Sequence, residues 1–181
     1  MATAGSAEGG AAEGSTGVRT AGGVPAHLAD KPVLLMSKLG FASMQLFHEA
    51  LEPLGLHPRH LALLNLLDAE DGRSQQALGE VLHIDPSTMV AVIDDLEREG
   101  LAERRRNPDD RRAYTVHLTA QGRSQLTRGR RAAKKVEDQV LAPLDPAERG
   151  RLLELLRRLA LAGHLPRFGP PGRSGDCAPP R

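Results

Sequence analysis

The spacing of helix signals between Ser74 and Gly100 constrains the fold of this chain most strongly. Ser74 can cap a short helix, because its hydroxyl oxygen can accept a hydrogen bond from a free backbone N–H in the first turn. Asp85 followed by Pro86 is a second start signal, since aspartate caps well and proline suits the first helical position. Gly100 ends the second helix. The sequence therefore predicts two consecutive helices with a sharp turn between them.

The second of these helices has one apolar side and one side that is small or polar. The apolar residues recur at spacings of three and four and should face the core: Met89, Val92, Ile93 and Leu96. The opposite side carries Ser87, Val90, Ala91 and Asp94, with Thr88 near the start. A helix with such a side can enter the DNA major groove, which is about 12 Å wide. An ordinary amphipathic surface helix has the same pattern, so this helix alone leaves both interpretations open.

Two extended segments, residues 101–105 and 113–118, follow the helix pair and predict a β-hairpin around an Asn-Pro-Asp-Asp turn. Basic side chains crowd its strand ends: Arg104, Arg105, Arg106, Arg111 and Arg112. Because like charges repel, this cluster indicates a bound anion, and phosphate is the natural partner. The alternative is a solvated cluster neutralised by neighbouring carboxylates.

Further helices frame this unit. Residues 33–47 form a strongly apolar helix, and a leucine-rich helix after Pro58 ends near Asp71-Gly72. Thr119 can cap a long polar helix that runs to about residue 140, and residues 145–148 are a capping-box start for a last, leucine-rich helix. The predicted fold is mainly α with a small β-hairpin wing, a winged helix-turn-helix flanked by N- and C-terminal helices.

Composition agrees with a helical protein, because three Phe and one Tyr are the only aromatic residues and the core must be built from aliphatic side chains. We expect residues 30–162 to fold, between a disordered Ala/Gly-rich tail at 1–29 and a disordered Pro/Gly-rich tail at 163–181. The 24 basic and 23 acidic side chains nearly cancel, so only local clusters could attract nucleic acid. No apolar run is long enough to span a bilayer, and the single Cys177 cannot form an internal disulfide, which favours a cytoplasmic location.

Several of these segments together resemble the multiple antibiotic resistance regulator (MarR) family over roughly residues 33–160. The resemblance lies in Asp-Pro-Ser-Thr-Met from residue 85, Asp-Leu-Glu-Arg-Glu-Gly-Leu from 95, Arg-Arg-Asn-Pro-Asp-Asp-Arg-Arg-Ala from 105, and Val-His-Leu-Thr from 116. It implies a transcription regulator that binds a palindromic DNA operator as a homodimer. It also implies a DNA-binding lobe at about 56–118 and dimerisation helices at about 30–50 and 119–162.

The resemblance also assigns DNA contacts. It implies that Arg112, oriented by Asp110, enters the minor groove, which agrees with the preference of arginine for a narrow, electronegative groove. Gln75 and Gln76 are expected phosphate contacts by position, although simple solvent exposure is an equal alternative. Many family members carry a polar or basic pair where this chain has Val90 and Ala91, so any base reading there would be apolar contact with thymine methyl groups. The full expected set is Gln75, Gln76, Pro86, Ser87, Thr88, Val90, Ala91, Arg105, Arg106, Asp110, Arg111 and Arg112.

Family members often sense small aromatic or anionic molecules in a crevice beside the dimerisation helices. Core or interface is the more usual role for most such side chains, and the residues that could line such a pocket here are Met36, Phe41, Met44, Phe47, His48, His57, Arg59 and His60. Two histidines without cysteine or grouped carboxylates are a weak zinc signal, so we expect no metal or cofactor. The sequence contains no glycine-rich phosphate loop or nucleophile motif, which argues against an enzyme. The remaining alternative is a winged helix that contacts another protein without binding specific DNA.

Overall fold

The structure is a computed structural model that describes residues 20–21, 24–25, 30–107 and 114–162. The chain divides into two compact units, Met1–Phe41 and Ala42–Arg181. In the first unit, strands β1 (Thr20–Ala21) and β2 (Val24–Pro25) pair antiparallel, a short ladder that the sequence did not predict. The rest of the expected N-terminal tail, and the whole of the expected tail at 163–181, lie outside the described residues.

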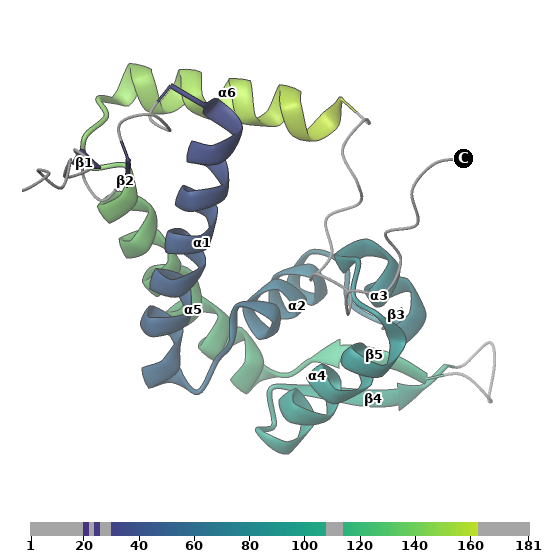
Figure 1. The fold of residues 1–181 in the computed structure, drawn as a ribbon. Helices are drawn as coiled ribbons and strands as arrows, with labels where there is room; N and C mark the ends of the chain where they lie inside the picture. Colours follow the sequence, from purple (N-terminus) through teal and green to yellow (C-terminus); the bar gives the residue numbers. More distant parts are fainter. Residues whose placement is uncertain (1–19, 22–23, 26–29, 108–113, 163–181) are drawn as a thin grey trace, which may run out of the picture. The chain divides into compact units, whose positions relative to one another are not determined.

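Helix α1 (Pro32–Leu51) begins in the first unit and ends in the second. The second unit continues with the 3-10 turn η2 (Glu52–Leu54) and helix α2 (Pro58–Ala69) (Figure 1). The elements that follow are β3 (Arg73–Ser74), α3 (Gln75–Leu82), α4 (Pro86–Arg98), β4 (Ala102–Arg106), β5 (Tyr114–Leu118), α5 (Ala120–Val140) and α6 (Pro146–Leu161). This order confirms the winged helix-turn-helix that the sequence predicts.

Four predicted helix starts are confirmed by their hydrogen bonds. The Ser74 hydroxyl oxygen accepts from the Ala77 N–H at 3.2 Å, and an Asp85 carboxylate oxygen accepts from the Thr88 N–H at 2.9 Å. Thr119 caps α5, and the Asp145–Glu148 capping box starts α6. Each start depends on residues at most three positions apart, which is why the sequence alone predicts it.

The sheet differs from the predicted two-stranded hairpin. Its strands are antiparallel in the order β3-β5-β4, so β3 adds a third strand at the edge. Helix α2 accordingly ends at Ala69, earlier than Asp71, because the chain turns at Gly72 and enters β3. A strand of two residues is too short to show the alternation of apolar and polar residues by which strands are recognised in a sequence.

The core of the second unit is aliphatic and includes the predicted inward side of α4. Met89, Val92, Ile93 and Leu96 are all buried. Helix α5 packs closely against this core at a glycine. A Cβ atom on Gly122 would lie 2.0 Å from the Leu101 carbonyl oxygen. The helix backbone therefore packs directly against the chain that leads into β4, which fixes the base of the hairpin.

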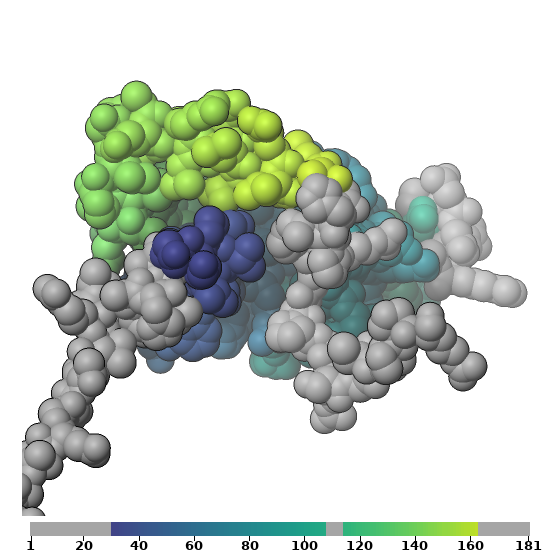
Figure 2. Space-filling view, turned by 45° about the horizontal axis from the view of Figure 1, so that its top comes forward, coloured from purple at the N-terminus to yellow at the C-terminus, as the bar shows by residue number. Residues whose placement is uncertain are grey.

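Other apolar side chains of the second unit remain exposed. Helix α6 has no buried residue, and it is the yellow-green band at the top of Figure 2. Its exposed large apolar side chains are Leu153, Leu155, Leu156, Leu159 and Leu161. In the first unit, α1 likewise exposes Val33, Leu34, Met36, Leu39 and Phe41. None of the helices among the described residues is both long and apolar enough to cross a membrane.

Candidate nucleic-acid interface

The outward side of α4 has the small, mixed surface that the sequence predicts. Pro86, Ser87, Val90 and Ala91 are exposed, and Thr88 is half-buried. The Ser87 hydroxyl donates to an Asp85 carboxylate oxygen at 2.5 Å, so its hydrogen is engaged within the helix cap. The hydrogen bonds from Ser87 and Thr88 hold the pKa of Asp85 well below its usual range. The first turn of α4 is therefore capped, and the outward side of the helix is mostly aliphatic.

A hollow lies between α3 and the start of α4. Its lining residues are Gln75, Gln76, Gly79, Glu80, Ile84 and Pro86. Three predicted DNA contacts, the two glutamines and Pro86, are thus brought together at one place. Gln76 also donates from its amide nitrogen to a Glu80 carboxylate oxygen at 3.0 Å, one helical turn away.

The three described arginines of the hairpin, residues 104–106, each have a partner within the protein. Arg105 is exposed and bonds to Glu103 on its own strand, with 2.9 Å between Nε and the carboxylate oxygen Oε1. Arg106 places its guanidinium carbon 5.9 Å from the centre of the Tyr114 ring, a cation–π contact. The predicted contacts Asp110, Arg111 and Arg112 lie outside the described residues.

Arg104 does not fit the interpretation of the cluster as an anion site, because its guanidinium group bonds to carboxylates of the protein itself. Its Nη1 lies 2.7 Å from an Asp94 carboxylate oxygen, and the same nitrogen bonds to Glu97. Burial on its own would lower the pKa of Arg104, but the bonds to Asp94 and Glu97 outweigh it and raise that pKa. Arg104 is therefore not a free phosphate-binding arginine, and grouping it with them was wrong. The sequence does not reveal its two carboxylate partners, because they lie on the preceding helix.

A row of linked side chains, which the sequence did not predict, holds the base of the hairpin. One Asp71 carboxylate oxygen accepts from the Leu118 N–H at 2.8 Å, and the other lies 3.0 Å from His117 Nδ1. His117 Nε2 in turn lies 2.9 Å from the Thr115 hydroxyl oxygen. Burial opposes ionisation of Asp71, but the bonds from Leu118 and His117 prevail and lower its pKa. The two contacts of Asp71 join residues 46 and 47 positions apart, too far for any local pattern.

The predicted effector-pocket residues fall into two groups. Met36 and Phe41 are exposed on the part of α1 in the first unit, while Met44, Phe47 and Arg59 lie in the second unit as exposed or half-buried side chains. The three histidines meet: the His48 and His57 rings stack with centres 5.1 Å apart, and the His57 and His60 rings lie edge to face at 5.2 Å. The described residues contain no group of three His, Cys, Asp or Glu that could hold a metal ion.

His60 is the buried member of this histidine group, with 6% of its surface exposed. Its Nδ1 accepts a hydrogen bond from the His57 N–H at 3.3 Å, and its Nε2 lies 3.7 Å from an Asp95 carboxylate oxygen on α4. Burial, helped by the nearby His57, lowers the pKa of His60 in spite of the opposing Asp95. A neutral His60 therefore caps α2 and touches α4.

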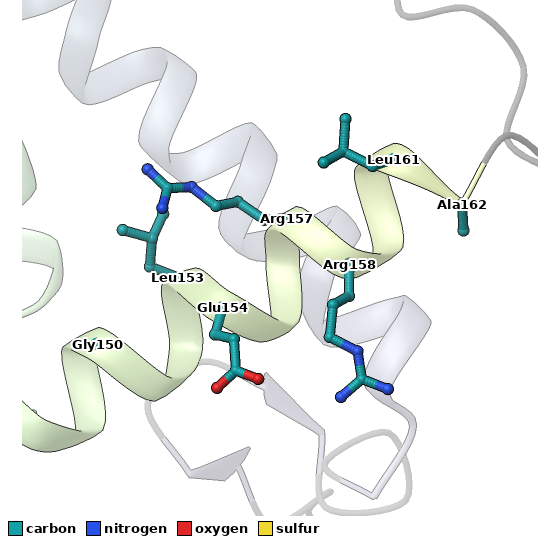
Figure 3. Close-up of a pocket in the computed structure, with 7 residues that line it drawn as sticks. All are labelled: Gly150, Leu153, Glu154, Arg157, Arg158, Leu161 and Ala162. Atoms are coloured by element: carbon teal, nitrogen blue, oxygen red, sulfur yellow. The ribbon is translucent and has the colours of Figure 1, made fainter.

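A second hollow lies on α6, away from the predicted contacts. In Figure 3, Leu153, Arg157 and Leu161 point to one side of the helix, and Glu154 and Arg158 point to the other. Gly150 and Ala162 complete the lining. With two arginines and exposed leucines, this surface is amphipathic and carries no residue of the expected DNA interface.

Comparisons with known proteins agree with this geometry. The sequence model of the MarR family matches residues 54–113, which run from η2 through the helix pair and β4 into the hairpin connection. The solved structure of the transcriptional repressor CouR, bound to a 23-mer DNA duplex, is 32% identical with a TM-score of 0.68, covering 75% of this chain and 96% of that one. The chain belongs to the MarR family.

Other MarR-like matches support the same assignment. A probable transcriptional regulator from Pseudomonas aeruginosa is 32% identical with a TM-score of 0.65, covering 73% of this chain and 98% of that one. A putative regulatory protein for the hcr operon of Thauera aromatica is 37% identical over 105 residues, 58% of this chain. That match spans 63% of the Thauera protein, a little under two thirds of its length. These MarR-family relatives are transcription regulators, a non-enzymatic class of protein.

Proposed function

We propose that this MarR-family protein is a ligand-responsive repressor that binds a palindromic operator in double-stranded DNA as a homodimer. The observation that carries the proposal is the exposed, small side of α4 placed beside a hairpin that carries exposed arginines. A helix with such a side can enter the major groove while arginines of the hairpin reach phosphate or the minor groove. CouR, a repressor 32% identical to this chain, is seen with a DNA duplex.

Three elements of the second unit would make the DNA contacts. On α3 and α4 they are Gln75, Gln76, Pro86, Ser87, Thr88, Val90 and Ala91. On the hairpin they are Arg105, Arg106, Asp110, Arg111 and Arg112. Tyr114 would support this set by holding Arg106 through their cation–π contact. Because Val90 and Ala91 are aliphatic, this protein would read thymine methyl groups there and gain less discrimination than from a bidentate arginine.

The exposed apolar side chains support the homodimer. Helix α6 exposes five leucines, and α1 exposes a further set of large apolar side chains described above. Apolar surface of this extent on a water-soluble chain marks an interaction site. A two-fold pair of chains would cover it and would also present two α4 helices to the two halves of a palindrome.

A small-molecule effector fits the histidine group in the second unit. His48, His57 and Arg59 are exposed donors beside the buried His60, which touches Asp95 on α4. An aromatic or anionic molecule bound among them would act on the helix that enters the groove. Release of DNA on binding such a molecule is the response we propose.

Fluorescence anisotropy of the purified protein with duplex DNA from upstream of its own gene tests the proposal. Random-sequence duplex of equal length is the control, and both are titrated at several salt concentrations. We expect tighter binding to the upstream duplex, with affinity that falls steeply as salt rises because bound phosphates release counterions. Binding to no duplex at low salt would instead favour a protein-contact module.

Replacing Arg112 by alanine separates these two functions further. A DNA-binding protein should lose affinity for the upstream duplex, because a minor-groove arginine is removed. A protein-contact module has no reason to respond. Addition of small aromatic acids to the preformed complex, with loss of anisotropy as the readout, then searches for the effector.

A further inference from the structure

We infer that Arg104 is a positioning residue for DNA recognition, which ties the hairpin to α4 and to the first turn of α3 and binds no phosphate itself. The inference rests on the proposed function. It gives a role to the hairpin arginine of the predicted basic cluster whose guanidinium group is already bound to carboxylates.

Four hydrogen bonds connect Arg104 on β4 to two other elements, α4 and α3. Its Nη1 bonds to Asp94, at 2.7 Å, and to Glu97, both on α4. Its Nη2 donates to the Gln75 side-chain oxygen on α3 at 3.4 Å, and its backbone N–H donates to a Glu97 carboxylate oxygen at 2.7 Å. The side chain is 23% exposed, against 60% for Arg105 on the same strand.

These bonds set Arg104 apart from its neighbours. A guanidinium group has five N–H donors and no acceptor, and bonds to carboxylates are the strong ones. Turning the Arg104 guanidinium toward a phosphate would abandon Asp94 and Glu97 and leave both charges uncompensated next to DNA. Among the described residues, Arg105 bonds to the exposed Glu103 two positions away, and it could exchange that partner for a phosphate at little cost.

The position of Asp94 explains why its ion pair with Arg104 matters for DNA binding. Asp94 is exposed and lies three and four positions after Ala91 and Val90, on the same side of α4. A free carboxylate there would repel the phosphates that flank the groove. Paired with Arg104, the carboxylate is compensated, and it also fixes the distance between the helix and β4.

The bond to Gln75 extends the tie to α3. When the Gln75 side-chain oxygen accepts from Arg104, its amide nitrogen remains as the donor. A donor at the first turn of α3 suits a phosphate contact. Arg104 thereby holds groove helix, hairpin and α3 start in one arrangement.

The test compares variants in the anisotropy assay, with thermal unfolding of each variant recorded beside it. The central variant is Arg104→Gln. Arg105→Gln represents loss of a phosphate contact, and Arg131→Gln is the matched control, because it removes the same charge from an exposed position on α5. A double variant, Asp94→Asn with Glu97→Gln, keeps Arg104 but removes both carboxylate partners.

We expect Arg104→Gln to weaken binding to the upstream duplex roughly tenfold, since charge-assisted bonds that hold the reading geometry are lost. Its affinity for random DNA and its salt slope should stay unchanged. Arg105→Gln should weaken binding to both duplexes and lower the slope by about 0.9, the value for one phosphate. The double variant should lose preference for the upstream duplex although its net charge becomes more positive, and Arg131→Gln should behave as wild type.

Three results would overturn the inference. A salt slope lowered by about 0.9 in Arg104→Gln, with equal losses on both duplexes, would make Arg104 a phosphate contact. An unchanged preference in a folded Arg104→Gln variant would remove its positioning role, and if that variant does not fold, an unchanged preference in the double variant decides against it. Wild-type protein that binds no duplex would overturn the proposed function and this role together, whereas normal wild-type binding confines the failure to Arg104.

Discussion

At residue 122 the side chain must be a single hydrogen atom. A Cβ there would lie 2.0 Å from the Leu101 carbonyl oxygen, which belongs to the backbone and cannot rotate away. At Gly150 on α6, by contrast, an added Cβ would meet nothing within 4 Å. The two helical glycines therefore have opposite requirements, although the sequence shows each simply as a glycine in a helix.

We predict opposite effects for the matched substitutions at these two positions. Gly122→Ala should lower the free energy of unfolding by at least about 2 kcal/mol, because helix and hairpin base must separate. Gly150→Ala should raise it by about 0.5–1 kcal/mol, since alanine is the better helix former. Urea denaturation at equal protein concentration measures both. Equal destabilisation by the two variants would contradict the close packing at Gly122.

A second prediction at the residue scale concerns His60 and pH. Burial lowers the pKa of His60 below 6.5, so the unfolded chain takes up this proton first as pH falls. The stabilisation by neutral His60 is therefore complete above pH 6.5 and is lost as pH falls from there toward the pKa of the folded state. Protonation at Nδ1 would also remove the acceptor for the His57 N–H. His57, Arg59 and Asp95 are the charged or titratable groups that act on this ring.

Thermal unfolding between about pH 7.5 and about pH 5.5 tests this sign. Wild-type protein should lose stability across this window, and His60→Gln, whose amide oxygen can still accept from His57, should lose less. His83→Asn is a suitable control, because His83 is exposed and has a φ of 52° that asparagine tolerates. Identical pH dependence in wild type and His60→Gln would show that another group controls the loss.

At the scale of elements, helix starts were predictable because they depend on neighbouring residues. Ser74, Asp85 and Thr119 all cap as the sequence indicates. The inward side of α4 was predictable for the same reason, since its spacing is a property of one helix. For the candidate site, the sequence predicted which residues of α4 face outward, and their contact with DNA stays a prediction.

Contacts between distant elements were not predictable. The bonds of Arg104 to Glu97 and Asp94 depend on how β4 meets α4, and the contact of Asp71 with His117 depends on how β5 meets the turn after α2. A basic cluster in a sequence does not show which of its members is already neutralised. Tyr114 was missed as a partner of Arg106 because the two residues face each other only through the register of β4 and β5.

The start of α5 gives a prediction at the element scale. The Thr119 hydroxyl accepts from the Gly122 N–H at 2.9 Å and donates to the Gly100 carbonyl oxygen at 2.7 Å. Thr119→Ala should lower the free energy of unfolding by about 1 kcal/mol, the usual cost of losing a helix cap. Thr119→Ser keeps the hydroxyl and should retain most of the stability in the same urea titration. If serine were as harmful as alanine, the methyl group rather than the cap would be responsible.

For the whole molecule, the exposed apolar surface says more about its interactions than the net charge does. The formal net charge is +1, so any attraction to DNA must come from local basic clusters such as the arginines of the hairpin. The exposed leucines of α6 and the exposed apolar side chains of α1 instead point to assembly.

Sedimentation velocity tests that assembly. We predict a dimer at micromolar concentration, because the apolar faces of α1 and α6 would be unfavourable in contact with water. Replacing Leu155 and Leu159 by glutamate should shift the protein toward monomer, while glutamate at the exposed Arg131 of α5 should not. A wild-type protein that stays monomeric at tens of micromolar would contradict the homodimer.

The bare leucines of α6 also affect how steeply a target gene would respond to the amount of this protein in the cell. If two chains must meet to cover those leucines before DNA is bound, operator occupancy at low abundance follows the square of the protein concentration. Halving the protein concentration would then cut occupancy about fourfold. The gene would pass from silent to expressed over a narrower range of protein abundance than a monomeric regulator permits.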